Sequence, residues 1–304
     1  MFQQFLARAA GFGVLAAALF LTSTASDAAT VDCDRGCLRQ VLDTYLNGVF
    51  KHDPAAAGLA ESYYATENTV MTLKGDGAWK NITGYGDLQR RLFDTYNHAA
   101  AYLGLLKRDG KNQVVSVRIK VDSRRKVSEA EWIFGLDGAG GEGKANPEAL
   151  IKNPPPEATL PVSERSSRFI LKSLANAYYQ AVKEHDGSWV PHTDDCVRIE
   201  NGVGGSAAPT EPAVNSRCLD NFARWRLLTK DVALRRFPVV DDEAGVVMGV
   251  ASFERYPGSD HRGLVGQEYF VVRDGKVAGI WHFIYFLPLG SPSTTGWENR
   301  VDSE

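Results

Sequence analysis

The chain has 304 residues, of which 44% are hydrophobic and 23% are charged, and its formal net charge is −3. At about 150 residues per domain, this length predicts two domains of ordinary size. A nucleic-acid binder built on a basic surface is excluded, because neutralising phosphates requires a clear excess of Lys and Arg. Low-complexity disorder is excluded by the high hydrophobic content.

Residues 1–28 have the pattern of a secretory signal peptide. Arg8 is followed by an apolar or small run from Ala9 to Leu21, and small-x-small patterns end at Ala25 and Ala28. The alternative is a membrane anchor, but a bilayer span needs about 20 apolar residues and this run is shorter. We therefore expect an exported protein, secreted or periplasmic, with no membrane association after cleavage.

Four cysteines enter the exported chain. Because an exported protein meets an oxidising environment, an even number of cysteines predicts two disulfides. Three connectivities are open, and the most local one joins Cys33 to Cys37 and Cys196 to Cys218. A zinc site is the alternative, but no His pair lies at ligand spacing, so we predict no metal site.

The middle of the chain, residues 137–164, is rich in Gly and Pro and predicts a linker without a regular helix or central strand. It separates a first unit, 32–136, from a second unit, 165–290, which is followed by a tail, 291–304. Residues 138–143 match the G-x-G-x-x-G pattern of dinucleotide sites, but prolines follow where a helix should open. We expect no cofactor.

The two halves resemble each other, which indicates an internal repeat. Amphipathic helical spacing over 38–49 and over 170–182 ends in both cases at His-Asp and a helix breaker. A strand then follows, with 66–71 matching 193–198. Each half closes with a strand pair around a tight turn, and an offset of 150 relates 119–127 to 269–277 on both sides of that turn.

Three motifs in the second half carry a family resemblance: Ala177-Tyr178-Tyr179-x-Ala181, the strand over 192–200 and the hairpin over 271–277. They resemble the nuclear transport factor two-like superfamily, the cone fold shared by SnoaL-like cyclases, ketosteroid isomerase and scytalone dehydratase. The whole chain looks like a tandem secreted form found in fungi and bacteria. The resemblance implies an α+β fold of two tandem cone-fold units, each a curved antiparallel sheet wrapped on a long N-terminal helix.

The last strand of the second unit carries the leading candidate for chemistry. Alternation over 277–286 places His282 as the only polar residue on one face, and both faces are otherwise apolar. The strand is therefore predicted to be buried twice, once on its own helix and once against the other half. His282 is either a general acid or base in an apolar pocket or a core histidine bonded to a backbone carbonyl or a tyrosine.

A second constellation combines His192 with the acidic pair that ends at Asp195. A carboxylate there can orient the imidazole, but the same residues can form a turn that begins the strand. Tyr178 is a candidate hydrogen-bond donor to a substrate oxygen, and core packing is the alternative. The candidate substrate-binding residues are Tyr179, Glu200, Trp281 and Tyr285.

The polar positions of the two halves differ, because Glu129 and Glu131 replace Gly279 and Trp281. We therefore predict one pocket, in the second unit, with the first unit as its partner wall in a monomeric pseudo-dimer. Three hypotheses follow from this fold, which hosts many functions. In order of preference they are a cofactor-independent lyase or isomerase that transfers protons on a small apolar, ring-containing molecule, a periplasmic binding protein without turnover, and a scaffold with a filled pocket.

Overall fold

The computed structural model describes residues 33–135, 145–204, 218–219 and 222–298. The predicted signal peptide, the start of the predicted linker and the end of the tail lie outside the described residues. Among the helices in the described ranges, none combines the length and the apolar character that a membrane span needs.

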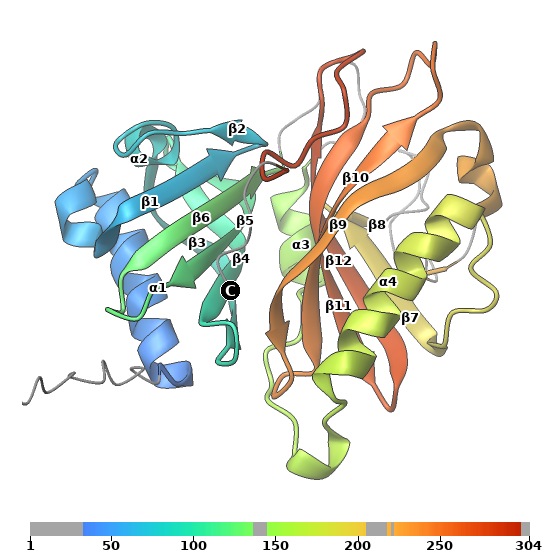
Figure 1. Cartoon of the computed structure of the whole chain (residues 1–304), viewed down its shortest axis with the longest axis horizontal. Helices are drawn as coiled ribbons and strands as arrows, with labels where there is room; N and C mark the ends of the chain where they lie inside the picture. Colours follow the sequence, from blue (N-terminus) through green and yellow to red (C-terminus); the bar gives the residue numbers. More distant parts are fainter. Residues whose placement is uncertain (1–32, 136–144, 205–217, 220–221, 299–304) are drawn as a thin grey trace, which may run out of the picture. The chain divides into compact units, whose positions relative to one another are not determined.

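The first half begins with a helix and continues as strands (Figure 1). Asp34 caps the helix by accepting a hydrogen bond from the Cys37 N–H at 2.8 Å, and the apolar stripe predicted from the sequence is buried. The elements are α1 (Arg35–Phe50), η1 (Pro54–Ala57), β1 (Leu59–Glu67), β2 (Val70–Met71), α2 (Ala78–Asn81), β3 (Ile82–Asp94), β4 (Ala99–Arg108), β5 (Lys111–Val121) and β6 (Val127–Phe134). The strands form the first sheet, in the order β2-β1-β6-β5-β4-β3.

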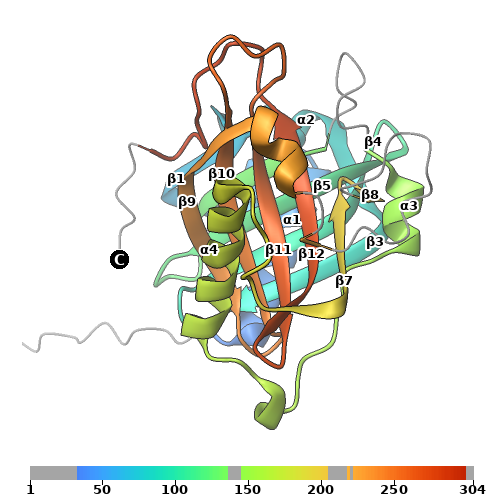
Figure 2. The ribbon, with the colours of Figure 1, turned by 90° about the vertical axis from the view of Figure 1, so that its right-hand side faces the viewer.

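The second half repeats this arrangement. Ser167 caps its long helix, which ends where His185 adopts a left-handed conformation with φ of 60°. The elements are α3 (Pro147–Lys152), η2 (Val162–Glu164), α4 (Arg168–Glu184), β7 (His192–Glu200), β8 (Val203–Gly204), η3 (Phe222–Leu227), β9 (Thr229–Asp241), β10 (Val246–Arg255), β11 (Leu264–Arg273) and β12 (Lys276–Phe286). The second sheet has the order β8-β7-β12-β11-β10-β9, and Figure 2 shows α4 lying along its face.

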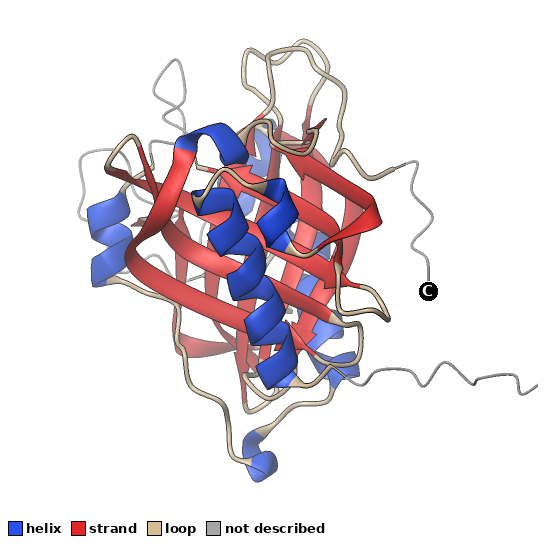
Figure 3. Cartoon of the chain, turned by 90° about the vertical axis from the view of Figure 1, so that its left-hand side faces the viewer, coloured by secondary structure: helices blue, strands red, loops and turns tan. Residues whose placement is uncertain are grey.

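The α+β class is confirmed: Figure 3 shows two sheets and few helices. The sheets are mixed, however, and the expectation of purely antiparallel sheets is wrong. β1 pairs with β6, and β7 with β12, in parallel. A parallel pair needs a long connection instead of a tight turn. Here the intervening strands supply that connection. The alternation of apolar residues along one strand does not show whether the strand runs parallel or antiparallel to its neighbour.

The predicted linker also contains regular structure. The six-residue helix α3 forms because Asn146 caps it through a 2.9 Å hydrogen bond from the Ala149 N–H and Pro147 occupies the first turn. Proline is tolerated there because that N–H would have no helical partner. The expectation that this stretch holds no regular helix is therefore wrong for residues 147–152.

Three apolar clusters account for the core. One lies between α1 and the first sheet, a second between α4 and the second sheet, and a third between the two sheets. β12 contributes Ile280 to the α4 cluster and Trp281 and Phe283 to the inter-sheet cluster. This confirms that the strand is buried on both faces.

Two buried aspartates cross-link the sheets reciprocally. Asp94, in the first sheet, accepts hydrogen bonds from the Val240 N–H at 2.7 Å and from Arg168 at 2.8 Å. Asp241, in the second sheet, accepts hydrogen bonds from the Phe93 N–H at 2.8 Å and from Arg35 at 2.6 Å. Each carboxylate therefore joins its own sheet to a strand or helix of the other half.

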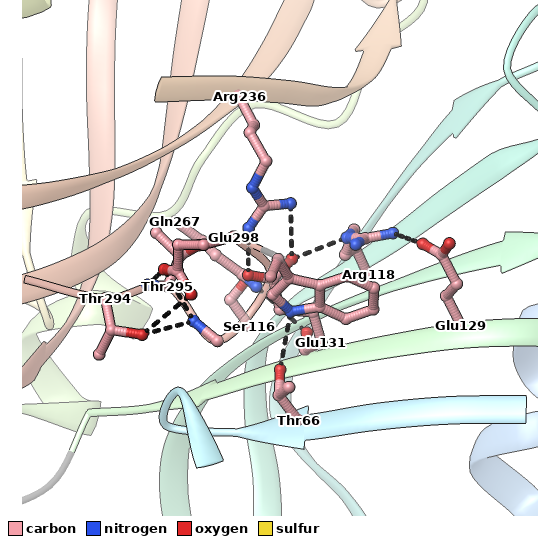
Figure 4. Close-up of polar contacts among 12 residues, drawn as sticks. Thr66, Ser116, Arg118, Glu129, Glu131, Arg236, Gln267, Thr294, Thr295 and Glu298 are labelled. Atoms are coloured by element: carbon pink, nitrogen blue, oxygen red, sulfur yellow. Dashed lines mark hydrogen bonds and ion pairs between the residues drawn. The ribbon is translucent and has the colours of Figure 1, made fainter. Parts of the chain in front are cut away.

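A polar cluster between the halves surrounds the buried Arg118 (Figure 4). Arg118 pairs with Glu129 at 2.7 Å and Glu131 at 2.8 Å, and Arg236 from β9 reaches Glu131 at 2.7 Å. Trp297, in the tail, lies against it with the Arg118 guanidinium 4.3 Å from its ring centroid. The tail of the second half therefore returns to the first sheet.

The contact between the tail and the first sheet should stabilise the fold. The Trp297 indole N–H donates to the Thr66 hydroxyl at 2.9 Å, and both residues are buried. Removing that acceptor in Thr66→Val should lower the free energy of unfolding by about 1–3 kcal/mol. Thr66→Ser keeps the hydroxyl and is the control. Urea unfolding followed by tryptophan fluorescence measures both variants, and equal stabilities would contradict this role for the contact.

The disulfides have the most local connectivity. Cys33 joins Cys37 with Cα atoms 5.1 Å apart, and Cys196 joins Cys218 with Cα atoms 5.4 Å apart. The two disulfides use all four cysteines, as predicted from their even number. Two disulfides are typical of proteins in an oxidising compartment.

Candidate functional site

A cavity of about 140 Å³ lies between α4 and one end of the second sheet. Apolar cavities of about this size hold a single aromatic ring. Apolar residues line most of it, and two carboxyl groups, an arginine and an imidazole converge there. The lining residues are Tyr178, Glu200, Leu228, Thr229, Phe253, Arg255, Leu264, Glu268, His282, Ile284 and Phe286.

Strand pairing brings the two central groups together. β11 and β12 are antiparallel, and Glu268 lies directly opposite His282 in their register. Directly opposite residues of an antiparallel pair project to the same face. The His282 Nδ1 and the Glu268 Oε1 are 3.1 Å apart, and both side chains are buried.

Burial sets the protonation of this pair. It raises the pKa of Glu268 to about 8, with a further contribution from the Glu200 carboxylate, while the Tyr179 hydroxyl and Arg198 act in the opposite direction. Burial, together with Arg198, lowers the pKa of His282 well below its ordinary value. At neutral pH, Glu268 therefore keeps its proton and His282 is uncharged.

Several buried polar atoms around this pair lack a partner at full hydrogen-bond geometry within the described ranges. They are the Tyr179 hydroxyl, both Glu268 oxygens and the His282 Nε2. An unsatisfied buried polar atom costs free energy, so native structures contain few. Glu268 Oε1 lies near His282 Nδ1, and the Tyr179 hydroxyl interacts with Glu268, but the three groups keep unused hydrogen-bonding capacity that suits a polar ligand.

Two glycines make room for these side chains. A Cβ at Gly249 would collide with the Tyr179 hydroxyl, and a Cβ at Gly266 would collide with the His282 imidazole. Both glycines lie in strands, where glycine often marks such a close approach.

A buried arginine, Arg198, acts electrostatically on this uncharged pair. Arg198 Nε lies 3.2 Å from Glu200 Oε1, and Arg198 Nη1 lies 3.5 Å from the Tyr178 hydroxyl. Arg198 is buried, while the Glu200 side chain is 30% exposed. Burial raises the pKa of Glu200, and Arg198 and Arg255 oppose that shift.

The structure brings some of the predicted residues together. His282, Tyr178 and Glu200 line the cavity, and Tyr179 lies behind it, near Glu268. These four residues come from the long helix α4 and the two adjacent strands β7 and β12.

Other predicted site residues lie elsewhere. His192 begins β7 and interacts with the Val190 carbonyl at 2.9 Å, and Asp195 is exposed. Trp281 and Tyr285 lie on the opposite face of β12, packed in or against the inter-sheet cluster. The cavity lining therefore includes none of these four residues. For Trp281 and Tyr285 the reason is that alternation from Ile280 onward directs odd-numbered side chains away from α4.

The sequence pattern alone identifies neither Glu268 nor Arg198 as a site residue. In the middle of β11 each face carries one polar residue, Gln267 or Glu268, among apolar ones, so hydrophobicity does not identify the helix-facing side. The usable signal was alternation with Phe270, which packs in the α4 cluster. Period two likewise places Arg198 on the same face of β7 as Cys196.

The same positions of the first sheet are apolar or aromatic. Val117 lies opposite Trp132 there, where Glu268 lies opposite His282 in the second sheet. The Trp132 indole N–H donates to the Tyr45 hydroxyl at 3.0 Å, and neighbouring aromatic rings pack around it. The acid–imidazole pair is therefore particular to the second sheet.

The strand registers correct the sequence alignment of the repeat. Glu67 pairs with Trp132 as Glu200 pairs with His282, so matching 66–71 with 193–198 is wrong by six positions. Val121 and Val272 pair equivalently with Val127 and Val277, so the offset is 151 before the closing turn and 150 after it.

The pair predicts a pH dependence of stability. The Glu268 pKa rises on folding from 4.5 to about 8, so the unfolded chain loses this proton first and stability falls as pH rises through this range. The depressed His282 pKa has the opposite effect, but its contribution is complete above about pH 6.5.

Between pH 6.5 and 8, wild type should therefore lose about 2 kcal/mol of unfolding free energy relative to Glu268→Gln, which cannot ionise. Urea unfolding of both proteins at pH 6.5, 7.2 and 8.0 measures the difference. Parallel pH profiles would show that Glu268 is ionised at neutral pH.

Comparisons with known proteins assign no activity. Residues 164–284 match a family described as a domain of unknown function, DUF8021, and this range includes all of the cavity lining except Phe286. No curated protein matches the sequence.

The solved structures that are similar to this chain include two proteins of unknown function. One is a nuclear transport factor two-like protein of unknown function from Cytophaga hutchinsonii, 12% identical over 32% of this chain and 88% of that chain, with a TM-score of 0.27. The other is a protein of unknown function with a cystatin-like fold from Methylobium petroleophilum, 13% identical over 37% of this chain and 85% of that chain, with a TM-score of 0.30.

Proposed function

We propose that the chain is an exported tandem of cone-fold units and that the cavity of the second unit is the active site of a cofactor-independent lyase or isomerase. The observation that carries the proposal is the Glu268–His282 pair, 3.1 Å apart at the cavity. Titratable groups whose pKa values are displaced in opposite directions are a mark of paired acid and base roles.

The pair suits proton transfer at neutral pH. His282 is the uncharged base and removes a proton from a carbon beside a carbonyl group, becoming an imidazolium. Glu268 is the protonated acid and donates to the oxygen on which negative charge develops. In an isomerisation the imidazolium returns the proton to another carbon. In a dehydration Glu268 protonates the departing hydroxyl, which leaves as water.

The cavity limits the substrate. Its volume of about 140 Å³ accommodates one ring, and Phe253, Leu264 and Ile284 give it apolar walls. A carbonyl or hydroxyl group on that ring supplies a partner for the buried polar atoms. We therefore propose small, neutral, single-ring ketones, enones or β-hydroxy carbonyl compounds.

Binding without turnover is the second candidate function. The same cavity supports it, since unsatisfied buried polar atoms also suit a ligand that is held unchanged. A scaffold with a filled pocket is disfavoured by the cavity itself.

The test is a screen of single-ring carbonyl and hydroxyl compounds by ligand-observed NMR, followed by time courses on each compound that binds. We expect hits to be restricted to single rings and at least one hit to convert to an isomer or a dehydrated product. Two-ring analogues are the size control. Binding without any conversion would support the binding protein, and an absence of hits would overturn both functions.

A further inference from the structure

Arg198 occupies a fixed position behind the cavity. It lies on β7 between Cys196 and Glu200, on the face that period two directs toward α4. Its Nη1 donates to the Cys218 carbonyl at 3.3 Å and contacts the Tyr178 hydroxyl, and its Nε pairs with Glu200. One guanidinium therefore contacts two cavity-lining side chains and one backbone carbonyl.

The Cys196–Cys218 disulfide fixes that carbonyl. The Cys218 N–H also donates to the Cys196 carbonyl at 3.0 Å, so two links join Cys218 to β7 two residues before Arg198. The Phe222 ring adds a wall 5.9 Å from the guanidinium. The planar fork of arginine suits such simultaneous contacts, and lysine cannot reproduce them.

We propose that Arg198, held by the carbonyl of disulfide-bonded Cys218, is a positioning residue that orients Glu200 and Tyr178 at the cavity. Its catalytic significance rests on the proposed function, but its structural role does not. The second disulfide, Cys33–Cys37, lies at the start of α1 in the first half and offers a matched control.

The charge of Arg198 acts on the same site. The charged and titratable groups around His282 are Glu268 from β11, Glu200 and Arg198 from β7, Arg255 from β10, and Tyr178 and Tyr179 from α4. Arg198 lowers the pKa of His282 and also those of both glutamates. Removing this charge should therefore raise the pKa of His282, a change that a purely structural contact would not predict.

The experiment follows the His282 imidazole by NMR in pH titrations without any substrate, with the resonance assigned from its loss in His282→Gln. Arg198→Met should raise the His282 midpoint above that of wild type, because the nearby positive charge is lost. Arg198→Lys keeps the charge but cannot reproduce the contacts of the fork, so its His282 midpoint should lie between those of Arg198→Met and wild type. The Cys196→Ala/Cys218→Ala pair should shift the His282 resonance, whereas Cys33→Ala/Cys37→Ala should leave it unchanged. Circular dichroism verifies folding, and the Lys and disulfide variants decide the question if Arg198→Met fails to fold.

Unchanged His282 titrations in Arg198→Met, or equal effects of the two disulfide pairs, would overturn the inference. Because these readouts need no turnover, they separate it from the proposed function. If the His282 titration shifts in Arg198→Met but the wild-type protein turns over no substrate, the positioning role of Arg198 is supported and the proposed enzymatic function is not. If the wild-type protein is active but the titration does not shift, the positioning role is rejected and the proposed function stands.

Discussion

Glu268→Gln and His282→Gln should each lower turnover of a converted substrate by about 10²- to 10⁴-fold, the usual contribution of a positioned acid or base. Each glutamine is similar in size to the residue it replaces, so the cavity walls are kept. Glu268→Gln removes the ionisable proton that we assign to the acid, and His282→Gln removes the base. Steady-state kinetics at pH 7, together with ligand affinity, separate lost chemistry from lost binding.

The matched control for these variants is His192→Gln. That imidazole lies at the start of β7, outside the cavity lining, and interacts with a backbone carbonyl. Its turnover should equal that of wild type. Full activity in both Glu268→Gln and His282→Gln, or a loss of activity confined to His192→Gln, would show that the active site does not lie in this cavity.

Asp94→Ala and Asp241→Ala should each lower the free energy of unfolding by about 3 kcal/mol or more, because removing one partner of a buried ion pair leaves charge and backbone N–H groups uncompensated. Both carboxylates are fully buried, and each bonds a backbone N–H of the other sheet. Urea unfolding with intact disulfides measures the loss.

The control for the aspartates is Glu157, whose side chain is 59% exposed and pairs with the half-buried Arg90. Glu157→Ala should change the free energy of unfolding by about 0.5 kcal/mol or less. If the aspartate variants lost no more than this control, the reciprocal contacts would not stabilise the pairing of the halves.

The helices and the burial of the last strand could be predicted from the sequence, because they depend on residues that are close together in the chain. The two long helices follow from apolar spacing and capping, with Asp34 and Ser167 at their starts. The double burial of β12 follows from its apolar faces. Alternation failed at its beginning, where a register shift between Val277 and Gly279 places Val277 and Ile280 in the same cluster. A bulge adds one residue and so inverts the pattern beside it.

The rest of the site depends on long-range pairing. Glu268 and His282 meet because β11 and β12 pair in one register, and Glu200 joins them through a parallel pair that no turn specifies. A slip of one residue would direct each side chain to the other face. For that reason the sequence indicates His282 and Glu200 as candidates but not Glu268, the acid that pairs with His282 from β11.

The most direct test of the central claim is deuterium exchange into a bound single-ring ketone or enone in D₂O at pH 7, measured by NMR. Exchange needs only removal and return of a carbon-bound proton, so it detects the proposed chemistry even when the equilibrium disfavours product. The account predicts exchange with wild type that falls by about 10²-fold or more in His282→Gln while the ligand still binds. Equal exchange rates in the two proteins, or a bound ligand that gains no deuterium from wild type, would contradict it.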